Sequence, residues 1–93
     1  MIKIVKLVSG DEIICDLELN NENAILKNPF RFLMTQEGLA SIPLMPFSKD
    51  KEYKISMNHV LFIAEPEDDF RNSYNAQHGN GIVLPTNNMV IRD

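Results

Sequence analysis

The 93-residue chain has little cysteine, few aromatic residues and no long apolar run. Its one cysteine, Cys15, excludes an internal disulfide, and there is no Asn-x-Ser/Thr acceptor. No apolar run approaches the roughly 18 residues that a transmembrane helix needs. The start, Met1-Ile2-Lys3-Ile4, does not have the long apolar core and cleavage site of a signal peptide. These absences predict a protein of the reducing cytoplasm that does not bind membranes.

Positive charge is also scarce. Nine Lys and Arg residues face thirteen Asp and Glu residues, which gives a formal net charge of −4. Proteins held to nucleic acid by bulk charge are usually basic, so binding of that kind would depend on a local patch. The length fits one domain that buries roughly 60–65% of its unfolded surface.

Short apolar segments separated by turn residues predict a β protein. Ile2–Val8 is a first strand, Ser9-Gly10-Asp11 a tight turn, and Ile13–Leu19 a strand with period-two alternation. After a turn at Asn20–Asn23, a third strand covers Ala24–Lys27. These segments predict consecutive antiparallel hairpins.

The next part of the chain contains prolines that interrupt strands. Asn28-Pro29 predicts a bend or bulge before extended chain at Phe30–Thr35. Leu39–Phe47 is a fourth strand in which two prolines leave positions without an N–H, and Ser48–Glu52 is a charged loop.

The stretch from Lys54 to Pro66 contains a polar corner at Asn58-His59 and then an unbroken apolar run, Val60–Ala64. Five apolar residues are too few for a typical helix and fit a strand that is buried on both faces. One face would pack on the core of the domain and the other on a second chain. The predicted subunit interface consists of Val60, Leu61, Phe62 and Ile63.

A helix follows, which begins at Pro66 or Asp68 and ends at His78-Gly79. Phe70 and Tyr74 lie four residues apart, so they share a face and should dock the helix on the strands. Beyond it, the sequence predicts a short strand and a tail, at Ile82–Leu84 and Thr86–Asp93. We therefore expect a small antiparallel barrel over residues 1–65 and a helix with an extension over residues 66–93, in a single domain.

Three segments resemble the motifs of Sm-like (LSm/Hfq-type) proteins. Leu7-Val8-Ser9-Gly10-Asp11-Glu12-Ile13-Ile14-Cys15-Asp16-Leu17 resembles the first motif, and Asn23-Ala24-Ile25-Leu26 resembles its closing asparagine and apolar strand. Ile55-Ser56-Met57-Asn58-His59-Val60-Leu61-Phe62-Ile63 is similar to the second motif. The resemblance covers about residues 4 to 65, and the acid-rich segment after Pro66 is similar to Sm-like proteins of marine phage type.

The resemblance implies a strongly bent five-stranded antiparallel barrel (SH3-type) in homo-oligomeric rings of five to seven subunits. The fourth strand of one subunit would pair with the fifth strand of the next. The family also binds single-stranded RNA near the central pore. This chain departs from the family pattern at that site, because Ser56-Met57 replaces the family's Arg-Gly and Cys15 replaces its second glycine.

Candidate RNA-binding residues are those near the family's pore loops: Asn23, Lys54, Ser56, Asn58 and His59. The asparagine and histidine side chains could bond base edges or phosphates. Alternatively, Asn23 fixes a turn and Asn58-His59 only turns a corner. Lys49, Lys51 and Lys54 could form a basic rim around a ring, or a solvated loop balanced by neighbouring acids.

Other clusters have weaker functional interpretations. Glu65, Glu67, Asp68 and Asp69 could bind a divalent cation, or could simply begin the helix. Cys15 could be a nucleophile with His59 or His78, but it lies on the apolar phase of its strand, which favours a core position. We therefore expect a non-enzymatic protein without cofactor or metal. Its function is either an RNA-binding ring or a scaffold ring with a protein partner.

Overall fold

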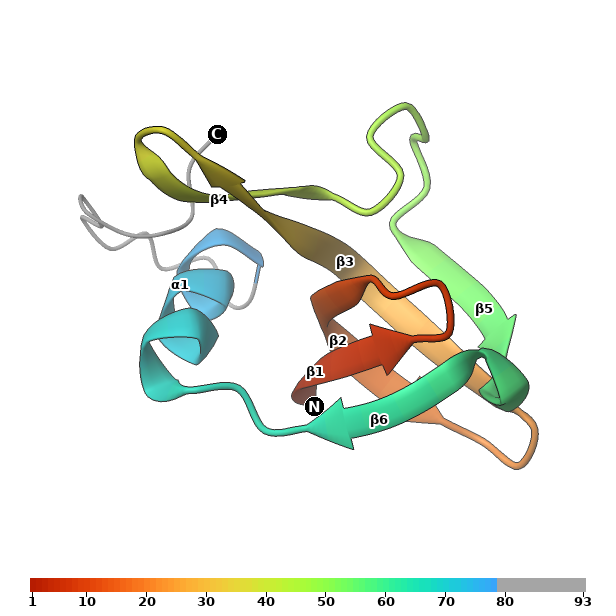
Figure 1. Ribbon diagram of the computed structural model, residues 1–93. Coiled ribbons are helices and arrows are strands. Elements are labelled where there is room, and N and C mark those ends of the chain that lie inside the picture. The colour runs from red at the N-terminus through yellow and green to blue at the C-terminus, as the bar shows by residue number, and fades with distance from the viewer. Residues whose placement is uncertain (79–93) are drawn as a thin grey trace.

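The computed structural model describes residues 1–78, which form an antiparallel sheet of six strands and one helix (Figure 1). The elements are β1 (Ile2–Leu7), β2 (Glu12–Leu19), β3 (Asn23–Thr35), β4 (Gly38–Pro43), β5 (Glu52–Ser56), the 3-10 turn η1 (Met57–His59), β6 (Val60–Ala64) and α1 (Asp68–His78). This confirms a mainly β protein with a helix after the strands. The strand predicted at Ile82–Leu84 and the tail at Thr86–Asp93 lie outside the described residues.

The predicted turns join the first strands as hairpins. Gly10, with φ +100°, turns the chain between β1 and β2, and Gly38, with φ +122°, begins β4 after the turn that follows β3. Side chains other than glycine rarely adopt this backbone region. Between β2 and β3, the Asn20 Oδ1 atom accepts hydrogen bonds from the backbone N–H groups of Glu22 and Asn23, at 3.2 and 2.9 Å.

The predicted closed five-stranded barrel is wrong in two respects. The sheet has six strands in the order β4-β3-β2-β1-β6, with β5 also paired to β3. Over residues 1–78 no ladder joins β5 to β6, and only η1 connects them. The sheet is therefore open between β5 and β6, and among the described residues β4, β5 and β6 each have one edge without a partner strand.

The extra strand is β5, which was not predicted, and the predicted fourth strand, Leu39–Phe47, is present only as the shorter β4. β4 ends at Pro43 and pairs with Phe30–Thr35 of β3, whereas β5 pairs with Asn23–Lys27 farther down the same β3 edge. Between them the chain leaves the sheet at residues 44–51, which we call the excursion. A strand through Pro43 and Pro46 could not supply an N–H at either position, so it ends there.

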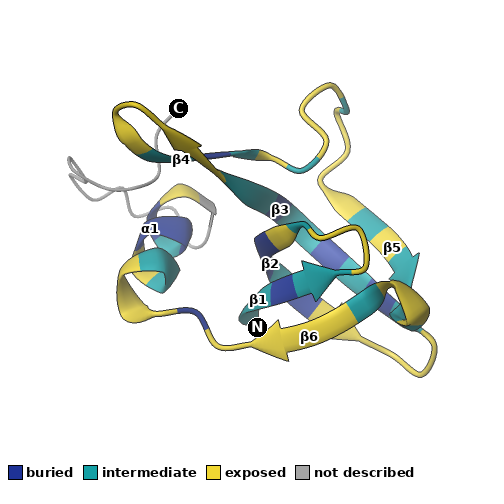
Figure 2. Ribbon diagram, in the orientation of Figure 1, coloured by how far each residue is buried: buried dark blue, intermediate teal, exposed yellow. Residues whose placement is uncertain are grey.

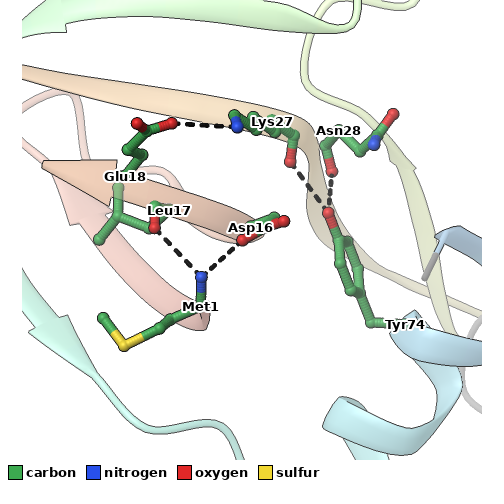
Figure 3. Close-up of polar contacts among 7 residues, drawn as sticks. All are labelled: Met1, Asp16, Leu17, Glu18, Lys27, Asn28 and Tyr74. Atoms are coloured by element: carbon green, nitrogen blue, oxygen red, sulfur yellow. Dashed lines mark hydrogen bonds and ion pairs between the residues drawn. The ribbon is translucent and has the colours of Figure 1, made fainter. Parts of the chain in front are cut away.

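The bend predicted at Asn28-Pro29 is present, and the helix supports it. Asn28 has φ +48°, and the β2–β3 register shifts nearby, between Ile14 and Asp16. The Tyr74 hydroxyl of α1 donates to the carbonyl oxygens of Lys27 and Asn28, both at 2.9 Å (Figure 3). Burial raises the pKa of the Tyr74 phenol, which keeps it protonated as a donor.

The buried residues lie mainly in β1, β2, β3 and α1 (Figure 2). The main core consists of Val5, Ile13, Cys15, Leu17, Ala24 and Leu26. On the other face, the fully buried Ile14 lies opposite Phe30 in the β2–β3 register. Phe32 shares that face, and its ring meets the Phe70 ring edge-on with centroids 5.2 Å apart. Helix α1 therefore covers this outer face, and the predicted docking through Phe70 and Tyr74 is confirmed.

Candidate functional site

The predicted RNA-binding residues meet where β5 ends and β3 begins. Asn23 and Ser56 are register partners, and the backbone N–H of Met57 donates to the Glu22 carbonyl oxygen at 3.0 Å. Ser56 Oγ accepts the backbone N–H of Asn58 at 3.1 Å and so caps η1. We call this surface, formed by Asn23, Lys54, Ser56, Asn58 and His59, the polar corner.

The turn geometry leaves two amides of the polar corner available. Asn20, not Asn23, fixes the β2–β3 turn, and Ser56, not Asn58, fixes the corner at η1. Within residues 1–78 the side-chain amides of Asn23 and Asn58 form no hydrogen bond to protein. Asn20 and Ser56 therefore supply the hydrogen bonds that hold these turns, and the side chains of Asn23 and Asn58 are not needed for them.

The remaining two members lie beside these amides. Lys54 is exposed and lies two residues before Ser56 in β5, so the two side chains share a face of the strand. His59 is exposed at the end of η1, and its carbonyl oxygen accepts the Val8 N–H at 2.9 Å. The polar corner thus combines amide groups, a hydroxyl, an imidazole and one ammonium group on adjoining elements.

The apolar strand β6 lies at an edge. It pairs with β1 through Ile4–Leu7, and among the described residues its other edge has no partner strand. Leu61, Phe62 and Ile63 are 52%, 69% and 38% exposed. Within the chain Val60 packs against the core cluster, while these three side chains remain exposed. That a second chain covers them, with this strand as a subunit interface, stays a prediction.

The acidic segment serves the start of the helix. Asp68 and Asp69 lie in the first turn of α1, and the Glu65 carboxylate pairs with Lys3 and, at 2.7 Å, with Arg71. Hydrogen bonds from Lys3 and then Arg71 lower the pKa of Glu65. No group of three or more His, Cys, Asp or Glu residues that could hold a metal occurs among residues 1–78.

Cys15 is fully buried in the core cluster, which confirms the core interpretation. Burial, followed by the charge of Asp16, raises the pKa of its thiol to about 12. The thiol is therefore protonated near neutral pH, and a nucleophile requires the thiolate.

A groove that the sequence did not predict lies on the face that α1 partly covers. It has a volume of about 630 Å³, with apolar walls that include Ile4, Phe32, Leu39 and Phe70. Its walls come from segments that are far apart in the sequence. The sequence signal for this groove is weak: Phe30 and Phe32 lie two residues apart in β3, so both side chains are on the face opposite to the main core.

Comparisons with known proteins leave the family open. No family model matches the chain, and no curated protein matches it. In the part of the chain that the structure describes, no helix is long and apolar enough to cross a membrane.

Proposed function

We propose that this chain is a non-catalytic Sm-like protein that assembles into a homo-oligomeric ring and holds single-stranded RNA at its polar corner. The observation that carries the proposal is the exposed apolar strand β6, which has an unpaired edge in the described chain. Exposed apolar edge strands promote association, and natural monomers usually protect such edges with charge, proline or a covering element.

β5 also has a free edge, with which β6 of another copy can pair. β5 pairs with β3 along one side only within residues 1–78. If β5 of one copy pairs with β6 of the next, two different surfaces meet at each interface, so the assembly is head-to-tail and closes into a ring when the rotation permits. This pairing corresponds to the fourth-with-fifth pairing that the Sm-like resemblance implies.

RNA binding is supported by the available amides of Asn23 and Asn58. Single-stranded RNA is recognised through exposed base edges, with which such amides can form hydrogen bonds. Lys54 adds one positive charge to each copy of the site. A ring repeats this weak site in every subunit, and the repetition raises the overall affinity by multivalency.

The alternative function is a scaffold ring that binds a protein partner. Two observations favour it: Ser56-Met57 stands where the family has Arg-Gly, and the net charge is −4. A ring of this kind would have the same assembly but no salt-dependent affinity for RNA.

The assembly is tested by sedimentation velocity of the wild type and of Phe62→Asp, with Phe62→Leu as the matched control. The aspartate places a charge on the apolar strand, so we expect this variant to be monomeric while the leucine variant keeps the mass of the ring. A Phe62→Asp variant that retains the wild-type mass would overturn the assignment of β6 to the interface.

RNA binding is tested on the confirmed ring by fluorescence anisotropy of labelled U-rich and A-rich oligonucleotides. We expect saturable binding that weakens with salt and with Asn58→Ala, but not with Asn72→Ala, which changes an exposed asparagine of α1. A ring that binds neither oligonucleotide at low salt would favour the scaffold function.

A further inference from the structure

The excursion, residues 44–51, is a loop that backbone hydrogen bonds hold in place. The Leu44 N–H donates to Pro29 O at 2.8 Å, and the Asn28 N–H donates to Lys51 O at 2.7 Å, so both ends are bonded to the bend in β3. Inside the loop, the Ser48 N–H donates to Met45 O at 3.1 Å. A loop held at both ends and closed by an internal turn presents its tip in a defined position.

That tip is apolar and exposed. Phe47 is 101% exposed, and Met45 is 50% exposed. Aromatic side chains and methionine are enriched in protein–protein interfaces, where buried aromatic residues often contribute most of the binding energy. A fully exposed phenylalanine on a fixed turn is therefore suited to insertion into a pocket of another molecule.

The groove on the outer face has the chemistry to receive it. Its apolar walls include Phe32 and Phe70, and its volume of about 630 Å³ exceeds what one phenylalanine side chain occupies. Ala64, Glu65, Pro66 and Glu67 also line it, so one end of the groove lies at the end of β6. In the same chain Phe47 is fully exposed, so it does not occupy its own groove.

Charge also favours a second copy as the occupant. The groove is lined by the carboxylates of Asp11, Glu12, Glu65 and Glu67 and by Lys6 and Arg31. Glu65 is paired with Lys3 and Arg71, whereas Glu67 at the end of the groove is exposed and forms no ion pair within residues 1–78. Beside Phe47 the excursion carries Lys49 and Lys51, both exposed, with one acid, Asp50, between them. The two lysines of the tip and the exposed Glu67 at the end of the groove are complementary in charge between copies.

We propose that Phe47 of one copy inserts into the groove of the next copy, with Lys49 and Lys51 facing the acidic lip at Glu67. This inference rests on the proposed ring, in which β5 of one copy pairs with β6 of the next. If that pairing is antiparallel, like every strand pair within the sheet, the start of β5 meets the end of the neighbouring β6. The excursion directly precedes β5, so it reaches the lip of the neighbouring groove.

Site-specific cross-linking tests the contact. Lys49→Cys and Glu67→Cys change exposed residues, keep Phe47, and are mixed as two single variants in the presence of a short bismaleimide. Buried Cys15, with its pKa raised to about 12, does not compete. A mixture of Lys49→Cys with Asn21→Cys is the control, because Asn21 lies by the β2–β3 turn at the opposite end of β5.

We expect the wild type to assemble and the Lys49→Cys and Glu67→Cys mixture to form a cross-linked dimer, while the control mixture does not. We also expect Phe47→Ser to raise the dissociation constant of assembly roughly tenfold or more. If the protein assembles but cross-links through Lys49→Cys with Asn21→Cys, or through neither pair, the insertion of Phe47 is wrong while the proposed ring is unaffected. A monomeric wild type would overturn both the ring and the insertion, and an unchanged dissociation constant for Phe47→Ser would overturn the anchor role.

Discussion

Removing one oxygen atom from Tyr74 should measure how strongly α1 supports the bend in β3. Tyr74 is 3% exposed, and its hydroxyl donates to two backbone carbonyls, those of Lys27 and Asn28. Tyr74→Phe keeps the ring in place but leaves these carbonyls without that donor. A typical hydrogen bond contributes about 0.5–1.5 kcal/mol net, and an unsatisfied buried acceptor costs about 1–3 kcal/mol. We therefore expect the free energy of unfolding to fall by about 1–2 kcal/mol.

The assay is urea and thermal unfolding followed by circular dichroism at one fixed protein concentration. For a domain of this size, each kcal/mol lowers Tm by roughly 4–8 °C. Tyr53→Phe is the matched control, since the Tyr53 hydroxyl donates to Asp50 O at 2.6 Å in an exposed position. We expect this variant to lose less than about 0.5 kcal/mol. Equal losses in the two variants would refute a special role for the Tyr74 hydroxyl.

Two further predictions concern titratable groups. Because Lys3 and Arg71 lower the pKa of Glu65 below its ordinary 4.5, the stability from this carboxylate is present above pH 4.5 and is lost as the pH falls through the lowered value. Glu65→Gln should therefore reduce the acid sensitivity of the urea midpoint below pH 4.5, and an unchanged pH profile would contradict the pairing. Burial of Cys15, which raises its pKa to about 12, should make it react slowly with a thiol reagent at pH 8 until urea unfolds the chain. Rapid labelling of the folded protein would contradict the burial of the Cys15 thiol in the core.

Local patterns predicted much of the fold. The alternation of Ile13, Cys15 and Leu17, the turn at Gly10, and the four-residue spacing of Phe70 and Tyr74 each depend on neighbours in sequence, and each was confirmed. The alternation fails at Ile14, which is fully buried, and at Leu19, which is 48% exposed. The closed barrel was wrong because closure depends on contacts between strands that are far apart in the chain. In particular, β4 and β5 share one edge of β3, and the excursion between them crosses the bend that Tyr74 supports.

The candidate site was predictable only in part. The Sm-like order of motifs placed Asn23 and the segment from Ser56 to Asn58 in one site, and the register pairs Asn23 with Ser56. The groove could not be predicted, because its walls come from β1, β2, β3, β4, β6, α1 and the segments beside them, and the packing of these elements decides whether a cavity remains. The exposed position of Phe47 was missed for a similar reason, since the sequence favoured a strand through that residue.

Hydrogen exchange of the β5 and β6 amides, measured by mass spectrometry at a high and a low protein concentration, tests the central claim most directly. Peptides from β2, which is paired on both sides, provide the internal reference. If β5 and β6 pair between copies, their amides exchange slowly at high concentration and faster on dilution or in Phe62→Asp, while β2 is unchanged. Exchange at β5 and β6 that is the same at both concentrations and in the variant would contradict head-to-tail assembly through these edges.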